Sequence, residues 1–325
     1  MIKEKMFFFE ELEQDCVQKL IFLSLEEDLE PYGDLSSSYL LDETLVKAEI
    51  IARESGILAC SSIVESVLGE GMEFFNKKAY FSKPLDAFCK VEQCLEEGDE
   101  FKAGDKLFII EAPANLLLAL ERTILNFLQR LCGIASLAKL LNEKLKDSKT
   151  KLLDTRKTNP GMRFLEKKAF ACAGATNHRV NLSEMIMLKE NHLALSKYED
   201  INEALKVFKL EIEKRSLKNY DDKPLKIELE INKDNLSLLD QLFKEAIVDQ
   251  IMLDNFSPDE IKSVMSDISE LRQKYPQAEK IAIEASGGIN LENIGDYVDL
   301  GLDYISSSYV SKFANAIDLT MLIKK

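Results

Sequence analysis

Groups that can hold a phosphorylated ligand follow apolar segments in the second half of this sequence. Glu230 lies in the segment 226–231, and Asp254 ends the segment 249–254. Lys157 follows a third apolar segment, 152–155, and Lys189 ends a fourth, 185–189. Carboxylates on neighbouring strands can share Mg²⁺ with phosphate groups or accept hydrogen bonds from ribose hydroxyls. Lysine supplies a compact positive charge for an anion.

The window 151–192 is cationic although the whole chain is strongly acidic. It holds eight Lys or Arg residues against four Asp or Glu residues, in a chain of 325 residues with a net charge of -15. Both histidines, His178 and His192, also lie in it. Arginine can bind a carboxylate or phosphate with two hydrogen bonds. A cationic pocket in an acidic protein therefore indicates a small anionic ligand, since a polyanion would be repelled by the remaining surface.

Two serine-rich or glycine-rich turns follow later apolar segments. Ser286-Gly287-Gly288 comes after the segment 281–286 and before an expected helix at 290–298, and a second turn lies at Ser306-Ser307-Ser308. Unpaired N–H groups at such a turn, where a helix begins, can hold a phosphate. Earlier in the chain, Thr158 or Asn159 is expected to cap a helix that has Pro160 in its first turn.

The pattern of apolar segments predicts an α/β protein with two domains. Strands are expected at 46–53 and 107–111, a short helix at 61–69 and a long helix at 116–146. Six short apolar strands then alternate with amphipathic helices, at 152–155, 185–189, 226–231, 249–254, 281–286 and 303–308. Such β/α units form a parallel sheet or barrel whose chemistry lies at the carboxyl ends of the strands. In the third strand, Glu228 and Glu230 are expected to share a face.

Composition excludes several classes of partner. The acidic net charge argues against nucleic acid and against an anionic membrane surface. No apolar run approaches the roughly 20 residues that span a bilayer, and the start of the chain lacks the features of a signal peptide. The protein is expected to be cytoplasmic. Its six cysteines are scattered, which is typical of reduced thiols.

Ordered motifs along nearly the whole chain resemble the quinolinate phosphoribosyltransferase family, the carboxylating nicotinate-nucleotide pyrophosphorylases. The resemblance is carried by LEEDLEPYGDLSS (25–37), LERTILNFLQRLCGIAS (120–136), DTRKTNPGMRFLEKKA (154–169), NHRVNLSE (177–184), LKENH (188–192), IELEI (227–231), IMLDN (251–255) and SGGIN (286–290). It implies an N-terminal α/β sandwich at 1–120 and an incomplete α/β barrel of the type II phosphoribosyltransferase kind at 121–310. A C-terminal helix is expected at 311–325, in a segment that can pack back on the first domain.

The resemblance also implies a role for each matched residue. Arg156, His178, Arg179 and Lys189 would bind the pyridine dicarboxylate, and Arg122 would reach the site of a neighbouring subunit. Lys157 would lie near phosphoribosyl pyrophosphate, and Glu230 and Asp254 would serve its ribose and Mg²⁺, directly or through water. The 5′-phosphate would be held by Ser286, Gly287, Gly288, Ser307 and Ser308. The residues expected to be catalytic are Lys157, Lys189, Glu230 and Asp254.

The reaction that the resemblance implies is a glycosyl (pentosyl) transfer in de novo NAD biosynthesis. Quinolinate and phosphoribosyl pyrophosphate give nicotinate mononucleotide, pyrophosphate and CO₂, with Mg²⁺ as cofactor. The enzyme would be a homodimer with shared active sites, or a higher oligomer of such dimers. Two alternatives are a non-catalytic anion-binding protein and a homologue associated with molybdate transport. Relatives of the latter usually lack the Lys189-Glu190-Asn191-His192 motif, which is complete here.

Five positions depart from the family pattern in the same way. The family usually has glycine there, and this chain has Cys60, Ala112, Ala173, Ala175 and Ser308. A side chain is strained where such a glycine takes a positive φ, and is tolerated elsewhere. The charged stretch 206–226 is expected to form a surface helix and loop without chemistry.

Overall fold

The chain folds into two compact units, each assembled from segments that are distant in the sequence. A computed structural model describes residues 2–41, 44–78, 89–198, 200–219 and 222–324, with the side chains of residues 2–12 left out. We call the units the sheet unit and the barrel unit. The sheet unit comprises Glu11–Lys139, Thr158–Gly174 and Val310–Lys325, and the barrel unit comprises Met1–Glu10, Leu140–Lys157 and Ala175–Tyr309.

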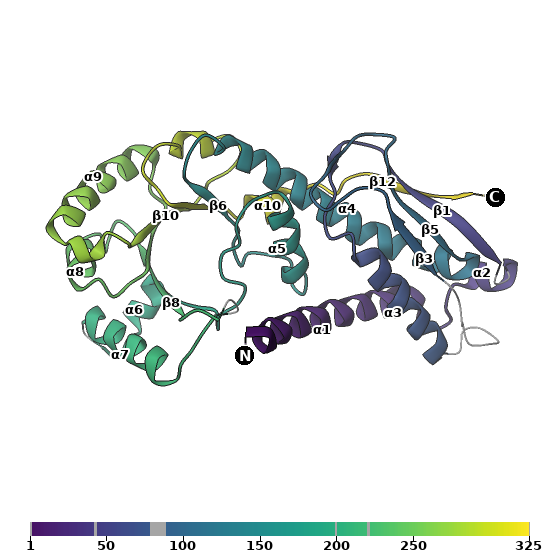
Figure 1. Ribbon diagram of the computed structural model, residues 1–325, viewed down its shortest axis with the longest axis horizontal. Coiled ribbons are helices and arrows are strands. Elements are labelled where there is room, and N and C mark those ends of the chain that lie inside the picture. The colour runs from purple at the N-terminus through teal and green to yellow at the C-terminus, as the bar shows by residue number, and fades with distance from the viewer. Residues whose placement is uncertain (1, 42–43, 79–88, 199, 220–221, 325) are drawn as a thin grey trace. The chain divides into compact units, whose positions relative to one another are not determined.

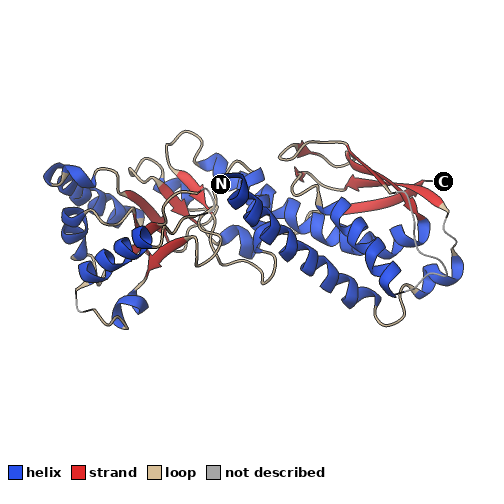
Figure 2. Cartoon of the chain, turned by 60° about the horizontal axis from the view of Figure 1, so that its bottom comes forward, coloured by secondary structure: helices blue, strands red, loops and turns tan. Residues whose placement is uncertain are grey.

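The sheet unit contains an antiparallel four-stranded sheet in the order β12-β1-β5-β3. The expected strands at 46–53 and 107–111 are confirmed as β1 (Leu45–Ala52) and β5 (Lys106–Pro113), which pair with each other. β3 (Lys90–Gln93) and β12 (Leu319–Lys324) lie at the two edges. A separate two-stranded ladder joins β2 (Gly56–Ile57) to β4 (Glu100–Phe101). In Figure 2 the helices of this unit lie on one side of the sheet.

Helix α4 (Ala114–Lys144) is the main apolar element of the sheet unit. Its side chains at Leu117, Leu120, Ile124 and Leu128 are completely buried, which explains the helical spacing in the sequence. By length and composition α4 could cross a membrane, contrary to the expectation that no segment approaches this limit. However, 61% of its most apolar window is buried inside the protein, as in a core helix. The other helices that lie wholly or mostly in this unit are α1 (Ile2–Leu29), α2 (Leu35–Leu40), α3 (Ile63–Lys78), α5 (Arg163–Cys172) and α10 (Tyr309–Phe313).

The barrel unit is built on six parallel strands in the order β6-β11-β10-β9-β8-β7. The strands curve round with helices on the outside (Figure 1), and β6 and β7 end the order, so the barrel is incomplete. All six expected strands are present: β6 (Lys151–Leu153), β7 (Met185–Leu188), β8 (Lys226–Ile231), β9 (Gln250–Asp254), β10 (Ala282–Ser286) and β11 (Tyr304–Ser306). The intervening helices are α6 (Glu190–Ala194), α7 (Ile201–Lys214), α8 (Leu238–Glu245), α9 (Pro258–Lys274), η1 (Pro276–Ala278) and η2 (Ile294–Tyr297).

The end of the chain differs from the expectation of a C-terminal helix at 311–325. After the short α10, residues Leu319–Lys324 form β12 and pair antiparallel with β1, from Ala52↔Leu319 to Lys47↔Lys324. The pairing partner is more than 260 residues away, so no local pattern reveals it. The expected boundary at residue 120 also lies inside α4, which continues to Lys144 without a break, and the two compact units change at Leu140.

Two expected helix starts also differ. The helix after Pro160 begins only at Arg163, with Met162 as its N-cap and no capping side chain. Gly161 takes a φ of 79°, which a right-handed helix does not allow, and Thr158 instead accepts a hydrogen bond from Arg163 Nε. The helix expected at 290–298 is reduced to η2, because Asn290 and Asn293 hydrogen-bond to the local backbone.

Two glycines provide a test of the packing in the sheet unit. A Cβ at Gly133 in α4 would lie 1.8 Å from the Asn315 carbonyl oxygen, whereas a Cβ at Gly69 in α3 would meet nothing within 4 Å. We expect Gly133→Ala to destabilise the protein by about 1–3 kcal/mol or more, because backbone must move. Gly69→Ala should stabilise it by up to about 1 kcal/mol through helix propensity. Thermal unfolding of both variants measures the difference, and equal effects would contradict this packing.

Candidate active site

The residues singled out in the barrel sequence gather at one end of the barrel. Most of them lie in the last part of a parallel strand or just after it, and parallel strands end at the same edge. His178 and Arg179 instead follow Thr176, which forms an isolated parallel bridge with Leu153 of β6. Arg156 and Lys157 follow β6, Lys189 follows β7, and Glu230 and Asp254 lie in β8 and β9. The residues at 286–288 and 306–308 end or follow β10 and β11.

A cluster of two carboxylates and two lysines occupies one side of this end. Lys189 Nζ forms an ion pair with Glu230 Oε2. Burial and the charge of Glu230 raise the pKa of Asp254, while Lys189 and Lys157 lower it. These four groups, predicted separately from four segments, therefore interact electrostatically. Opposite charges this close partly neutralise one another. A bound anion would therefore change the balance of charge among these four groups.

Two guanidinium groups form a second cluster. Arg179 is buried, and its Nη1 donates to the Met185 carbonyl at 2.9 Å, which fixes the side chain. Burial and the positive charge of Arg156 lower the pKa of Arg179. Arg156 Nε is buried and has no hydrogen-bond acceptor within the described part of the chain. Two adjacent arginines, one with an unused donor, suit a ligand that carries two negative groups.

The imidazole of His178 points into the barrel interior, toward two carboxylates. Its Nε2 lies 3.1 Å from Glu228 Oε2 and 3.5 Å from Glu284 Oε2, and both acids are completely buried. Gln250 Nε2 donates to both acids, at 3.1 Å to Glu228 Oε1 and 2.5 Å to Glu284 Oε2. The Arg179 N–H donates to His178 Nδ1 at 2.7 Å. His178 thus lies next to the arginine pair but directs its ring away from solvent.

The hydrogen bonds decide where the proton of this cluster lies. Burial lowers the pKa of His178 and the two acids raise it, to about 10 overall, which favours the imidazolium. A protonated Nδ1, however, could not accept the hydrogen bond from Arg179. In this arrangement the ring is therefore neutral, with its proton on Nε2. The compensating proton belongs on Glu284, whose pKa is raised by burial and by Glu228.

The same proton assignment argues against a metal at this position. One donor atom each from His178, Glu228 and Glu284 lie within 4.8 Å of one another, as three metal ligands would. A histidine nitrogen that carries a proton cannot coordinate a metal ion, and Nε2 carries it here. This buried cluster is better described as a hydrogen-bond network. Glu230 and Asp254, near the carboxyl ends of β8 and β9, offer hard oxygen ligands of the type that Mg²⁺ prefers.

The two candidate phosphate loops are tied together by Ser307. Its hydroxyl donates to the Ile289 carbonyl at 2.6 Å and accepts from Tyr309 N at 3.1 Å. Ser307 is also buried, so its side chain serves the loop structure, whereas Ser308 is half-buried. Gly287 and Gly288 take φ values of 101° and 65°. Because only the short η2 follows, a phosphate would be held by the turn itself and not by a helix terminus.

A repeated asparagine pattern, which the sequence reasoning missed, shapes two of the loops. Asn232 N donates to Asn235 Oδ1, and Asn290 N donates to Asn293 Oδ1, each at 2.8 Å. Asn293 Nδ2 then holds the Gly288 carbonyl at 3.1 Å. The recurring sequence I-N-x-x-N after β8 and β10, INKDN (231–235) and INLEN (289–293), is the signal that would have revealed it.

Four of the five family glycine positions need no glycine in this chain. Ala173 has a φ of −79°, and Ala112, Ala175 and Ser308 are not among the described residues with positive φ. The residue between the two alanines, Gly174, does take a positive φ of 76° and remains glycine. Cys60 is the exception, with a φ of 55° and a buried thiol. The replacements near the site therefore cost little backbone strain.

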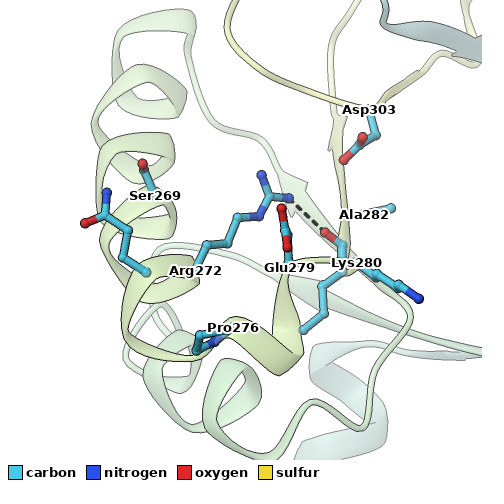
Figure 3. Close-up of a pocket in the computed structure, with 9 residues that line it drawn as sticks. Ser269, Arg272, Pro276, Glu279, Lys280, Ala282 and Asp303 are labelled. Carbon is cyan, nitrogen blue, oxygen red and sulfur yellow. Dashed lines mark hydrogen bonds between the residues drawn. The ribbon is translucent and has the colours of Figure 1, made fainter.

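Arg122 lies in α4 of the sheet unit and is exposed. It borders a cavity of about 390 Å³ with Arg130 and with Glu27 and Asp28 of α1. A larger cavity of about 580 Å³ lies in the barrel unit at the opposite, amino ends of β10 and β11 (Figure 3). There Arg272 donates to the Ile281 carbonyl at 2.9 Å. None of the predicted site residues line this second cavity, so it is not the active-site candidate.

Comparisons with known proteins agree with this geometry. Residues 34–132 match the family model described as the N-terminal domain of quinolinate phosphoribosyl transferase, and residues 134–322 match its C-terminal domain. The fold and site thus define a two-unit phosphoribosyltransferase. More particularly, the chain belongs to the quinolinate phosphoribosyl transferase family.

Individual relatives cover most of the chain. A probable nicotinate-nucleotide pyrophosphorylase [carboxylating] of Bacillus subtilis (strain 168) is 33% identical over 295 residues, 89% of this chain and 87% of that protein. Quinolinate phosphoribosyltransferase [decarboxylating] 1 of Nicotiana glauca is 28% identical, over 94% of this chain and 81% of its own. The solved nicotinate-nucleotide pyrophosphorylase of Francisella tularensis superposes with a TM-score of 0.75 at 31% identity, covering 96% of this chain and 97% of that one.

The two buried acids should respond differently to the same substitution. Glu228 Oε1 accepts from Gln250, and Oε2 faces the Nε2–H of His178 at 3.1 Å, so Glu228→Gln would bring an amide N–H against one donor or the other and cost about 1–3 kcal/mol. Glu284 accepts through Oε2 alone, while its other oxygen lacks a well-formed hydrogen bond within the described residues, with Ser306 beside it. Glu284→Gln should therefore be tolerated.

The pH dependence of stability tests whether Glu284 is protonated in the native state. Because its pKa is raised in the folded protein, the native state keeps a proton that the unfolded state loses as the pH rises above about 4.5. The free energy of unfolding of the wild-type protein therefore falls as the pH rises. Glu284→Gln removes this fall, because glutamine does not ionise. The stability of Glu284→Gln relative to wild type, from denaturant unfolding between pH 4 and 8, should increase with pH. A constant or falling difference would show that Glu284 is ionised in the native state.

Proposed function

We propose that this protein transfers the phosphoribosyl group of phosphoribosyl pyrophosphate to quinolinate and releases CO₂, forming nicotinate mononucleotide and pyrophosphate for NAD biosynthesis. The observation that carries the proposal is the juxtaposition of two clusters at one end of the barrel, the arginine pair and the Lys189–Glu230–Asp254 group. The named activities of the related proteins support it.

The arginine pair is suited to the two carboxylates of quinolinate. Arg179 is held by the Met185 carbonyl, so it is oriented before a ligand arrives. The buried, unused Nε of Arg156 would gain an acceptor when a carboxylate binds. In our proposal His178 acts beside them by accepting the Arg179 N–H. Lys189 completes the pocket from the other side.

The carboxylate group is suited to the sugar. The pyridine nitrogen attacks the anomeric carbon as the bond to pyrophosphate breaks, and positive charge develops on the ribose. Glu230 and Asp254 would stabilise that charge, and Lys157 and Lys189 would stabilise the departing pyrophosphate. The ring then carries a positive nitrogen, which stabilises the electron pair left on the adjacent ring carbon when its carboxylate departs as CO₂. A proton replaces that carboxylate on the ring carbon.

Magnesium and a dimer are parts of the same proposal. Glu230 and Asp254 would hold Mg²⁺, directly or through water, and the ion would neutralise charge on the pyrophosphate. Arg122 is exposed and lies outside the barrel unit, which is compatible with a role in the site of a neighbouring subunit.

The motif that argues against a molybdate-associated homologue has a structural explanation. Lys189-Glu190-Asn191-His192 begins α6, where His192 Nδ1 accepts from the Lys189 N–H at 3.0 Å. Glu190 accepts from Asn232 of the next loop. The motif thereby holds the backbone at Lys189, whose ammonium group pairs with Glu230.

An assay tests the reaction directly. Purified protein with Mg²⁺, phosphoribosyl pyrophosphate and quinolinate should yield nicotinate mononucleotide and CO₂ in equal amounts. Removal of Mg²⁺ with a chelator should abolish turnover, and its return should restore it. Turnover with nicotinate but not with quinolinate would refute the substrate assignment, and no turnover with either would favour the non-catalytic alternative.

A mixing experiment tests the shared site. Arg122→Ala and Arg179→Ala should each lose at least about 100-fold in kcat/KM, because each removes a charged contact to the substrate. If Arg122 acts across the dimer, hybrid dimers contain one intact site, and mixed variants should recover up to about a quarter of wild-type activity. Absence of recovery, in dimers shown to exchange subunits, would contradict a shared site.

A further inference from the structure

Asn255, which directly follows Asp254, has an uncommon backbone conformation for a residue with a side chain. Its φ is 60°, in the left-handed region, where asparagine is better tolerated than most residues. Asp254 is the last residue of β9 and pairs in register with Ser286, the last residue of β10. The Asn255 N–H donates to the Ser286 carbonyl at 2.9 Å, which extends the ladder by one bond as the chain turns.

The Asn255 side chain turns back onto Asp254. Its Nδ2 donates to Asp254 Oδ2 at 2.6 Å. A carboxylate can only accept, so the amide nitrogen must face Asp254, and the amide oxygen then faces the other way. One oxygen of Asp254, Oδ2, is therefore already engaged by Asn255. A hydrogen bond to an ionised acceptor is among the stronger ones in proteins.

The amide oxygen of Asn255 lies against Gly287. A Cβ at Gly287 would lie 2.2 Å from Asn255 Oδ1 and 2.8 Å from Asn255 N, whereas a Cβ at Gly288 would meet nothing within 4 Å. Gly287 is thus required not only by its φ of 101° but also by the space that Asn255 occupies. One side chain touches both the carboxylate end of β9 and the turn that follows β10.

From these contacts we infer that Asn255 is a positioning residue, which sets the orientation of Asp254 and the path of the Ser286–Gly288 turn together. This inference rests on the proposed function, in which Asp254 serves the ribose and the turn holds the 5′-phosphate of one substrate. Neither group belongs to the quinolinate pocket. Loss of the Asn255 amide should therefore affect phosphoribosyl pyrophosphate selectively.

Asn255→Gly is the informative variant, because glycine adopts the left-handed backbone without strain and removes only the amide. Asp299→Gly is the matched control, since Asp299 is exposed and has a similar φ of 62° in another loop of the barrel unit. We expect Asn255→Gly to lower kcat/KM for phosphoribosyl pyrophosphate by roughly tenfold or more. The KM for quinolinate should stay within about twofold, and Asp299→Gly should match wild type in both.

Unchanged kinetics for phosphoribosyl pyrophosphate in Asn255→Gly would overturn the inference. So would equal losses for both substrates together with a lower unfolding temperature, which indicate a general structural role. A crystal structure of Asn255→Gly tests the positioning without any substrate: Asp254 should change its side-chain orientation and the 286–288 turn should shift. An unmoved Asp254 carboxylate would refute the inference even if the wild-type protein proved inactive, an outcome that would count against the proposed function alone.

Discussion

The placement of charge inside the barrel is the constraint on which the site depends. Glu228 and Glu284 are completely buried, and an ionised carboxylate is costly there unless it is paired and hydrogen-bonded. The neutral His178 ring, the amide of Gln250 and a proton on Glu284 together lower this cost. Arg179 is connected to the network through its N–H to His178, so the buried acids help to fix the position of the Arg179 backbone.

At the carboxyl end of the barrel, cations and anions from different strands interact with one another. Lys189 is paired with Glu230, and Asp254 feels both of them together with Lys157. A parallel barrel brings residues from different strands to one edge, so groups that are some 100 residues apart can act as one. The acidic net charge of the chain does not conflict with an anionic substrate. The local arrangement of charges, and not the net charge of the chain, determines the electrostatic field in the pocket.

The strands and most site residues could be predicted from the sequence because their signals are local. Apolar clusters such as KIELEI, followed by polar residues, predict both a strand and its functional end. What could not be predicted depends on contacts between distant residues: the pairing of β12 with β1, the contact of His178 with Glu228 and Glu284, and the use of Ser307 within its loop. The helix start at Arg163 was missed because Gly161 takes a left-handed conformation, which proline and asparagine before it do not reveal.

The pairing of β12 with β1 has a consequence for how the chain folds during its synthesis. β1 is made early, but the strand that covers its edge is the last one described in the sequence. Every strand of the barrel has left the ribosome before β12 does, so the barrel can form while the first sheet still has an open edge. An open edge is prone to pair with other chains. The edge of the first-made sheet is therefore closed only after β11, the last described strand of the barrel, has been synthesised.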